Sequence, residues 1–245
     1  MKLDTIRYLN QLNRNFYDAV ADDFDQTRGT AWRGWTRLVP FLKTPLSVLD
    51  IGCGNGRFGV FLWEEMAKIS SGSIKTDAPL ITYDGIDSSS ILLARAQTTL
   101  DKLGKLAYHL SQQDIVENPP VVGDYDLVVL LGVLHHIPGY EERQAFIRHL
   151  ASRVKPGGLL MFTAWRFYEY PRFRERIAQW PDGVTVESND YLLDWRRGTV
   201  SLRYCHYTDD AEHDALVAAS GLTEILTFRA DGQDGAANRY SLLRK

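Results

Sequence analysis

The sequence predicts an α/β fold built on one mostly parallel sheet of seven strands. Short apolar runs alternate with segments whose apolar residues recur at helical spacing, which is typical of successive strand–helix–strand units. The 245 residues, 44% hydrophobic and 24% charged, fit one large globular domain. The last two strand-like runs have only a turn-rich stretch between them, so we expect an antiparallel hairpin at the end of the sheet.

The elements follow in order along the chain. The five alternating strands are expected at residues 47–51, 80–87, 107–110, 125–131 and 159–165. Helical spacing of apolar residues indicates three helices, over 58–66, 92–103 and 144–154. A last helix is expected between Asp209, which opens a capping-box pattern, and Gly221, a typical helix stop. The hairpin strands are then residues 223–228 and 239–243.

We expect a single domain, 1–245, made of four consecutive parts. These are a helical N-terminal extension (1–40), a core (41–165), an insertion after the fifth strand (166–207), and the final helix with the hairpin (208–245). Residues 165–207 hold ten of the 28 aromatic residues and seven interleaved arginines. Such a composition suits an unstacked base with its phosphates, a lid over a planar acidic molecule, or a hydrophobic cap over the sheet edge.

Composition argues against several classes of protein. The net charge of −3 lacks the basic excess of a free-standing nucleic-acid binder. No apolar run approaches the roughly 20 residues of a membrane span, and the first residues lack the apolar stretch of a signal peptide. Two cysteines, Cys53 and Cys205, make neither a disulfide framework nor a zinc ligand set. We therefore expect a cytoplasmic protein with no metal and no membrane partner.

A glycine turn follows the first strand, at residues 52–56 (GCGNG). Such a turn lets a ligand approach the backbone and the start of the next helix. Residues 54–59 also match the G-x-G-x-x-G pattern of dinucleotide sites. However, Asp50 lies two residues before the first glycine, where it would repel a pyrophosphate and favour the ammonium and sulfonium of S-adenosylmethionine. The charge pattern therefore favours S-adenosylmethionine over NAD.

With this turn, the chain resembles the class I S-adenosylmethionine-dependent methyltransferases over residues 48–165. Four further motifs match in order: Asp87 at the mouth of the second strand, then residues 113–115 (QDI), 131–138 (LGVLHHIP) and 155–158 (KPGG). The resemblance implies that Asp87 holds the ribose hydroxyls and that Asp114 reaches the adenine amino group. Asp84 is the other acid that could hold the ribose, but it lies inside the strand. The spacing between the glycine turn and Asp87 is long, and we assign the extra residues to a surface loop at 70–79. The cofactor residues so implied within the core are Asp50, Gly52, Gly54, Asn55, Asp87, Ser88, Asp114, Ile115 and Val133.

The flanks of the core resemble the tRNA wobble-uridine carboxymethyl methyltransferases, the Trm9 and ALKBH8 type. The matching segments are residues 16–28 with Trp32, the pair 164–165 (AW), and 202–207 (LRYCHY). The resemblance implies that Tyr17 and Arg28 close over the cofactor, with Arg28 near its carboxylate. It also implies a tRNA substrate and a small zinc-finger activator protein as partner. The insertion and the acidic charge balance do not match that group, which leaves a different acceptor open.

The chemistry of the acceptor decides which residues are needed. A carboxylate is already a nucleophile at neutral pH, so it requires only alignment and an arginine grip. Arg203 and His206 are the first candidates for this grip. A hydroxyl acceptor instead requires a base, which His135 or His136 at the end of the fourth strand can supply, although a double histidine can also serve to shape the backbone. The remaining substrate-binding candidates are Trp32, Trp165 and Arg166.

Three functions therefore stay open. The first is methylation of the carboxylate of a carboxymethyl-uridine at the tRNA wobble position. The second is an O- or N-methyltransferase acting on a small acidic or phenolic metabolite. The third is a non-catalytic binding module on the same fold, against which the complete set of cofactor residues argues.

Overall fold

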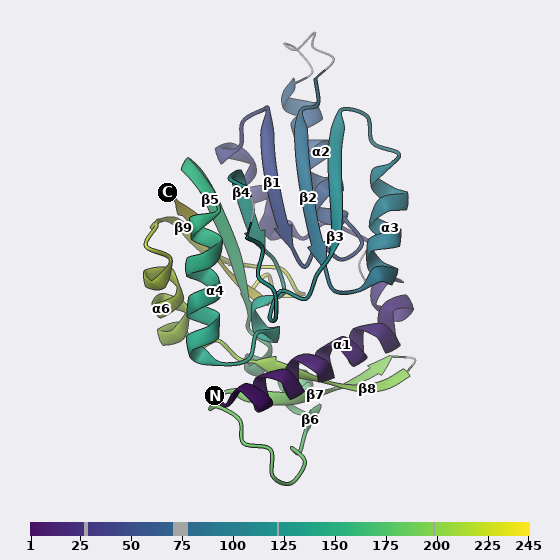
Figure 1. Cartoon of the computed structure of the whole chain (residues 1–245), viewed down its shortest axis with the longest axis vertical. Coiled ribbons are helices and arrows are strands. Elements are labelled where there is room, and N and C mark those ends of the chain that lie inside the picture. Colours follow the sequence, from purple (N-terminus) through teal and green to yellow (C-terminus); the bar gives the residue numbers. More distant parts are fainter. Residues whose placement is uncertain (27–28, 71–77, 122, 198) are drawn as a thin grey trace.

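The computed structural model describes residues 1–26, 29–70, 78–121, 123–197 and 199–245, and its main sheet has the order β3-β2-β1-β4-β5-β10-β9 (Figure 1). Its strands are β1 (Leu46–Ile51), β2 (Ile81–Asp87), β3 (Leu106–Gln112), β4 (Tyr125–Leu130), β5 (Val154–Trp165), β9 (Thr223–Ala230) and β10 (Asn238–Arg244). Strand β10 runs antiparallel to both β5 and β9. The predicted seven-stranded sheet with its terminal hairpin is therefore confirmed. Most of the expected loop at 70–79 lies outside the described residues.

Helices cover both faces of this sheet. They are α2 (Arg57–Ser70), α3 (Ser90–Leu100), α4 (Tyr140–Ser152) and α6 (Asp210–Ser220). Because neighbouring residues of a strand face opposite sides, Val48 packs in one apolar cluster with Leu62 of α2, and Leu49 packs in a second with Ile147 of α4. Helix α6 begins and ends at the predicted signals, since Asp209 caps it and Gly221 is left-handed.

The fifth strand begins earlier than the sequence predicts. From the sequence we expect residues 155–158 (KPGG) to form the turn before this strand; in the structure they are part of β5, which starts at Val154, but they bulge from the ladder with β4, where Tyr125 pairs with Val154 and Leu127 with Leu159. Gly157 has a positive φ of 78°, yet Lys155 donates to Asp126 Oδ2 on β4 at 3.1 Å and to Ser47 Oγ on β1 at 2.9 Å. These contacts hold the bulged segment against the sheet.

The N-terminal extension packs against the insertion. The extension consists of α1 (Leu3–Gln26) and the 3-10 turns η1 (Arg33–Arg37) and η2 (Val39–Phe41). The insertion forms η4 (Phe167–Glu169), α5 (Pro171–Arg174) and a second antiparallel sheet of β6 (Ile177–Ala178), β7 (Asp190–Arg197) and β8 (Thr199–His206). Figure 1 shows α1 and this second sheet lying across the carboxyl ends of the main strands.

No helix in the described part of the chain is both long and apolar enough to span a bilayer.

Candidate active site

A cavity of about 430 Å³ opens at the carboxyl ends of β1 and β4, where the strand order of the sheet reverses. Ligands of open α/β sheets bind at this position, and the volume is that of a small-molecule site. Its core end is lined by strand ends and turns of the main sheet, among them Asp50, Gly52, Gly54, Asn55, Asp87, Ser88, Asp114, Ile115 and Val133. Its insertion end is lined by residues of β5 and the insertion, among them Trp165, Arg172, Phe173, Arg176, Trp195 and Arg203.

The glycine turn after β1 is closed on one side and open toward the cavity. Gly52 and Gly54 have φ values of 72° and 55°, which favour glycine. A Cβ atom on Gly52 would lie 2.2 Å from Val133 Cγ2, whereas a Cβ on Gly54 would meet nothing within 4 Å. The loop after β4 therefore packs directly on Gly52, and the backbone at Gly54 is left accessible to a ligand.

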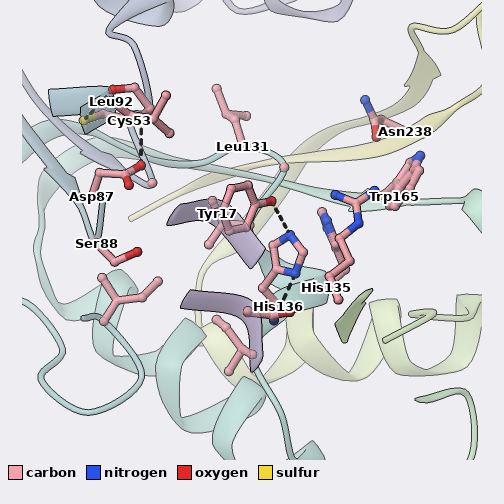
Figure 2. A pocket seen from close by; sticks show the side chains of 18 of the residues that line it. Tyr17, Cys53, Asp87, Ser88, Leu92, Leu131, His135, His136, Trp165 and Asn238 are labelled. Atoms are coloured by element: carbon pink, nitrogen blue, oxygen red, sulfur yellow. Dashed lines mark hydrogen bonds between the residues drawn. The ribbon is translucent and has the colours of Figure 1, made fainter. Parts of the chain in front are cut away.

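Asp87 lies at the mouth of β2 with its carboxylate fixed by backbone donors. Gly54 N donates to Oδ2 at 2.8 Å and Ser89 N donates to Oδ1 at 2.9 Å, and Figure 2 shows the group beside Ser88 and Cys53. Burial raises the pKa of Asp87, and these hydrogen bonds oppose the rise. Asp84 instead accepts a hydrogen bond from the Tyr125 hydroxyl at 2.7 Å and does not line the cavity.

Asp50 is a buried acid whose pKa lies close to neutral pH. Its side chain is 2% exposed and accepts a hydrogen bond from the Tyr83 hydroxyl at 2.5 Å. Burial, with a smaller contribution from the charge of Asp87, raises the pKa of Asp50 to about 7. A cation bound at the core end would stabilise the ionised form.

Asp114 is held by helix α1, a contact that the sequence did not reveal. Its Oδ2 accepts hydrogen bonds from Asn10 Nδ2 at 2.7 Å and from Arg14 at 3.0 Å. Both residues line the cavity together with Asn13 and Tyr17, and the spacing 10, 13, 14, 17 puts them on one helical face. The recurrence of polar residues at positions 10, 13, 14 and 17 is the feature of the sequence that could have predicted this contact. The other residue implied on this extension, Arg28, lies outside the described residues.

His136 joins α1 to the end of β4. The Tyr17 hydroxyl lies 2.7 Å from His136 Nε2 (Figure 2). His136 Nδ1 lies 3.1 Å from Tyr204 O and 3.2 Å from Asn13 Nδ2. Because the Tyr204 carbonyl accepts and the Asn13 amide nitrogen donates, these contacts fit either tautomer of His136, and the Tyr17 hydroxyl can donate to Nε2 or accept from it. His135 is buried at the insertion end against Trp165, with ring centroids 5.1 Å apart.

Arg203 is the most buried charge at the insertion end, with 8% exposure. Its Cζ atom lies 5.2 Å from the ring centre of Phe16, 5.1 Å from that of Trp165 and 5.8 Å from that of Trp195. Stacking on aromatic faces leaves the guanidinium N–H donors available. Within the described part of the chain, no carboxylate forms an ion pair with Arg203.

Trp32 and Arg57 also line the cavity. The Trp32 ring lies so close to Gly132 that a Cβ there would meet it at 2.8 Å, and the Arg57 guanidinium lies 4.7 Å from the Trp32 ring centre. Arg57 was not singled out from the sequence, although its position at the start of α2 was visible there.

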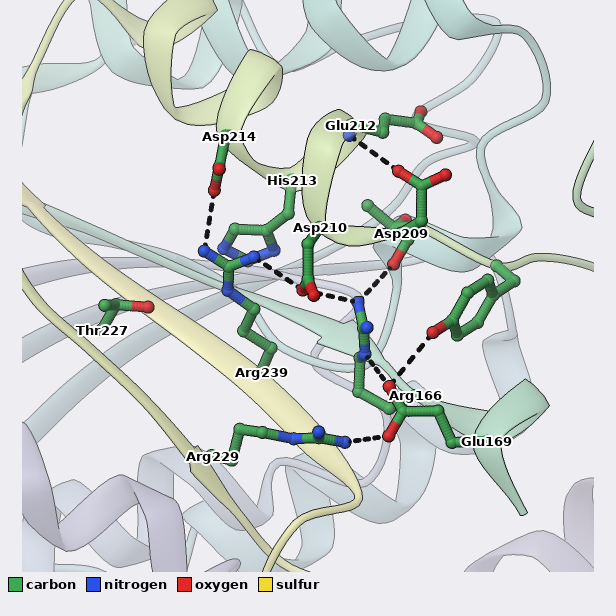
Figure 3. Close-up of polar contacts among 12 residues, drawn as sticks. Arg166, Glu169, Asp209, Asp210, Glu212, His213, Asp214, Thr227, Arg229 and Arg239 are labelled. Carbon is green, nitrogen blue, oxygen red and sulfur yellow. Dashed lines mark hydrogen bonds and ion pairs between the residues drawn. The ribbon is translucent and has the colours of Figure 1, made fainter.

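Two predicted acceptor residues, His206 and Arg166, lie away from the cavity. His206 is 2% exposed and bonded to Asp190 Oδ1 at 2.7 Å and to Glu212 Oε2 at 2.6 Å; although burial opposes it, these carboxylates raise its pKa. Positions three apart on a strand face opposite sides, so β8 directs His206 away from Arg203, which lines the cavity. Arg166 is buried among Glu169, Asp210 and the carbonyl of Thr208 (Figure 3).

The core end fits S-adenosylmethionine. Asp87 offers two carboxylate oxygens for a ribose diol, and Gly54 leaves space for close approach to the backbone. The buried Asp50 carboxylate suits a cationic amino acid group and opposes a pyrophosphate. When bound there, S-adenosylmethionine would supply an electrophilic methyl carbon.

Comparison with known proteins agrees with this fit. Residues 49–160 match the family model described as a methyltransferase domain. The chain is 28% identical to the mouse tRNA (carboxymethyluridine(34)-5-O)-methyltransferase ALKBH8 over 71% of this chain and 22% of that protein. It is also 28% identical to the Saccharomyces cerevisiae tRNA (carboxymethyluridine(34)-5-O)-methyltransferase, over 61% of this chain and 46% of that protein. The chain thus spans less than half the length of these two relatives.

Solved structures show the same fold. A Methanosarcina mazei S-adenosylmethionine-dependent methyltransferase superposes with a TM-score of 0.63 at 18% identity, covering 85% of this chain and 96% of that one. The N-methyltransferase NodS of Bradyrhizobium japonicum, solved with S-adenosyl-L-homocysteine, has a TM-score of 0.55 at 16% identity and covers 98% of each chain. Residues 49–160 therefore match a methyltransferase domain, and the fold of the chain is that of the S-adenosylmethionine-dependent methyltransferases.

Proposed function

We propose that this enzyme methylates a carboxylate, and that its acceptor is a carboxymethyl-uridine at the tRNA wobble position. The observation that carries the proposal is the Arg203 guanidinium, buried among three aromatic rings and without an ion-pair partner in the described chain. An unpaired buried charge is costly, so we infer that its counterion arrives with the acceptor. The relatives named as carboxymethyluridine methyltransferases support the choice of carboxylate.

The residues divide the work between binding and alignment. Asp87, Asp50 and Asp114 hold the cofactor at the core end, and Arg203 grips the acceptor carboxylate with two parallel N–H donors. Trp165 and Trp195 offer aromatic faces for the base. No proton needs to be removed, because the carboxylate is ionised at neutral pH. Catalysis then depends on holding the two reacting groups in line.

Helix α1 closes the site from outside. Asn13 Oδ1 accepts a hydrogen bond from Tyr204 N at 2.9 Å, and Tyr17 bonds His136, so the helix is tied to both β8 and the loop after β4. This arrangement restricts access of water to the reacting groups.

The test is methyl transfer from labelled cofactor to tRNA that carries carboxymethyl-uridine, with tRNA lacking that modification as control. Label should enter only the modified tRNA and be released by mild alkali, because a methyl ester hydrolyses. Arg203→Ala should reduce transfer by about 100-fold or more, at roughly 1.5–3 kcal/mol for each lost charged hydrogen bond, with cofactor affinity unchanged. Arg203→Lys should restore only part, since an ammonium lacks the two-pronged geometry.

A matched control is Arg174→Ala on α5, an exposed arginine whose guanidinium donates to Tyr168 O at 2.7 Å and does not line the cavity. It should behave as wild type. Alkali-resistant label, or normal turnover in a folded Arg203→Ala protein, would exclude the carboxylate mechanism.

A second candidate is transfer to a hydroxyl group of a small acidic or phenolic metabolite. The pairing of Tyr17 with His136 in the same cavity favours it, because an imidazole nitrogen can accept the hydroxyl proton. A ubiquinone biosynthesis O-methyltransferase of Sodalis glossinidius is 32% identical over 48% of this chain and 40% of that protein. In this case His136→Gln should abolish turnover, and kcat should rise with pH as the imidazole loses its proton.

The small zinc-finger activator, the cytoplasmic location and the four-part division of the single domain remain predictions from the sequence. Co-purification from the source cells would test the first of these.

A further inference from the structure

We propose that the insertion end binds a second anion of the acceptor, a phosphate, on Arg172 and Arg176, beside the carboxylate on Arg203. The role of Arg203 rests on the proposed function above, whereas the phosphate site stands on its own observations. Three guanidinium groups line this end of one cavity. Arg203 is buried, Arg176 is half-buried and Arg172 is exposed, so positive charge extends from the interior of the cavity to its rim.

These three arginines differ from the other arginines around them. Within the described residues, none of the three side chains forms a hydrogen bond or an ion pair, and no ion pair joins them to Asp194, the acid at the same end. Nearby arginines instead form ion pairs, as Figure 3 shows. Arg239 pairs with both Asp210 and Asp214. Glu169 pairs with both Arg166 and Arg229. Acids are therefore plentiful in this region, but within the described residues they form no ion pair with Arg172, Arg176 or Arg203.

The local packing supports the Arg172 guanidinium without using its donors. Its Cζ atom lies 4.9 Å from the ring centre of Phe173 and 5.3 Å from that of Tyr170. The backbone of Arg176 is fixed to the second sheet, because its carbonyl accepts from Asp194 N at 2.9 Å. A planar guanidinium held by stacking keeps all five N–H groups for phosphate or carboxylate oxygens.

The charge balance identifies the ligand class. Arg203, Arg176 and Arg172 place three positive charges at this end of the cavity, where they repel one another, and among the described residues Asp194 forms no ion pair with them. A phosphate or phosphodiester group supplies negative charge there and offers oxygen acceptors to two guanidinium groups. The aromatic residues Trp165, Phe173 and Trp195 line the same end and suit a planar ring attached to that phosphate.

This phosphate can come from an RNA backbone or from a small phosphorylated metabolite, and a binding experiment without methyl transfer separates the two. The probes are uridine, uridine 5′-monophosphate and a short oligouridylate, titrated into the full-length protein at several salt concentrations. We expect the two phosphate-bearing probes to bind at least 10-fold more tightly than uridine. Tighter binding of the oligouridylate assigns the site to a phosphodiester, and tighter binding of the monophosphate assigns it to a small metabolite.

The variants locate the site. Arg176→Gln should weaken binding of the monophosphate and of the oligouridylate about 10-fold and leave binding of uridine unchanged. Arg172→Gln should weaken the same two probes to a smaller extent, because the Arg172 side chain is exposed. If the ligand is RNA, Arg176→Gln should also lower the salt slope by about 0.7, the share of one phosphate on a single strand. The matched control, Arg174→Gln, should retain wild-type binding.

Equal binding of uridine and its monophosphate, or an equal loss in Arg174→Gln, would overturn the phosphate site. A protein that distinguishes these probes but methylates no carboxylate would refute the proposed function and leave the phosphate site standing.

Discussion

The two ends of the cavity are built in different ways. At the core end, Asp50, Gly52 and Gly54 lie within five residues of one another, and Asp87 is fixed by backbone donors at the end of the adjacent strand. At the insertion end, Arg203 is enclosed by rings from α1, β5 and β7, which are far apart in the sequence. One end depends on strand-end geometry and the other on the docking of α1 and a second sheet. Substitutions should therefore affect the two ends separately.

The largest expected effect is on cofactor binding at the core end. Asp87→Ala removes an acceptor for two ribose hydroxyls and should weaken S-adenosylmethionine by about 3–6 kcal/mol, at roughly 1.5–3 kcal/mol for each charged hydrogen bond. Calorimetry would measure this, with binding of uridine 5′-monophosphate as a check that the insertion end is intact. Asp84→Ala, an acid on the same strand outside the cavity, is the control. A greater loss in Asp84→Ala than in Asp87→Ala would move the ribose contact to the other acid.

The next largest effect is expected on the stability of the second sheet, which carries His206 on β8. His206→Ala leaves Asp190 and Glu212 buried without their shared cation, so the free energy of unfolding should fall by about 3–5 kcal/mol. The raised pKa of His206 means that its contribution is complete below the unfolded value of about 6.5 and is lost as pH rises through the folded pKa. Denaturation at pH 6 and pH 9 would therefore give a wild-type advantage that shrinks at the higher pH.

The exposed His109 provides a control for this experiment, because its removal should leave stability nearly unchanged at both pH values. A His206→Ala protein as stable as wild type at pH 6 would contradict a structural role for this residue.

Asp50 should show opposite effects on stability and affinity. Because burial raises its pKa to about 7, the folded protein binds more protons than the unfolded chain between about pH 4 and 7, and stability falls with rising pH across that window. Asp50→Asn keeps an acceptor for Tyr83 and removes the buried charge. Its melting temperature without cofactor should exceed that of wild type at pH 8, while S-adenosylmethionine should bind about 10-fold more weakly, the equivalent of roughly 1.4 kcal/mol.

The pH profile sharpens this prediction. Wild-type affinity should increase as pH rises through about 7, and Asp50→Asn should show no such step. The same step in both proteins would assign the titration to another group.

The smallest expected effect is at Tyr17. Tyr17→Phe removes the hydrogen bond to His136 and should cost about 1 kcal/mol of stability. With a carboxylate acceptor, turnover should change by less than a few fold, because no proton is transferred. A loss of 100-fold or more would instead favour the hydroxyl acceptor, so this variant decides between the two candidate reactions.

The core end was largely accessible to sequence reasoning, because its parts are local. Strand runs, the glycine turn and the acids at the strand ends occur at fixed offsets, and parallel strands bring their carboxyl ends to one edge. The pairing of Asp114 with Asn10 and Arg14 was not accessible, since it depends on where α1 docks. The start of β5 at Val154 has a similar cause, because Lys155 reaches across to Asp126 and Ser47 and holds the bulged segment against the sheet.

By itself the sequence determined the α/β fold, the position of the glycine turn and the acids that face the core end, because strand alternation and turn geometry act over a few residues. Only the tertiary structure decided which of the candidate acceptor residues face the cavity. It put Arg203 among three rings, turned His206 to the other side of β8 and buried Arg166 among acids. The physical reason is that burial and ion pairing depend on contacts between distant segments, and a strand exposes a side chain to one face only.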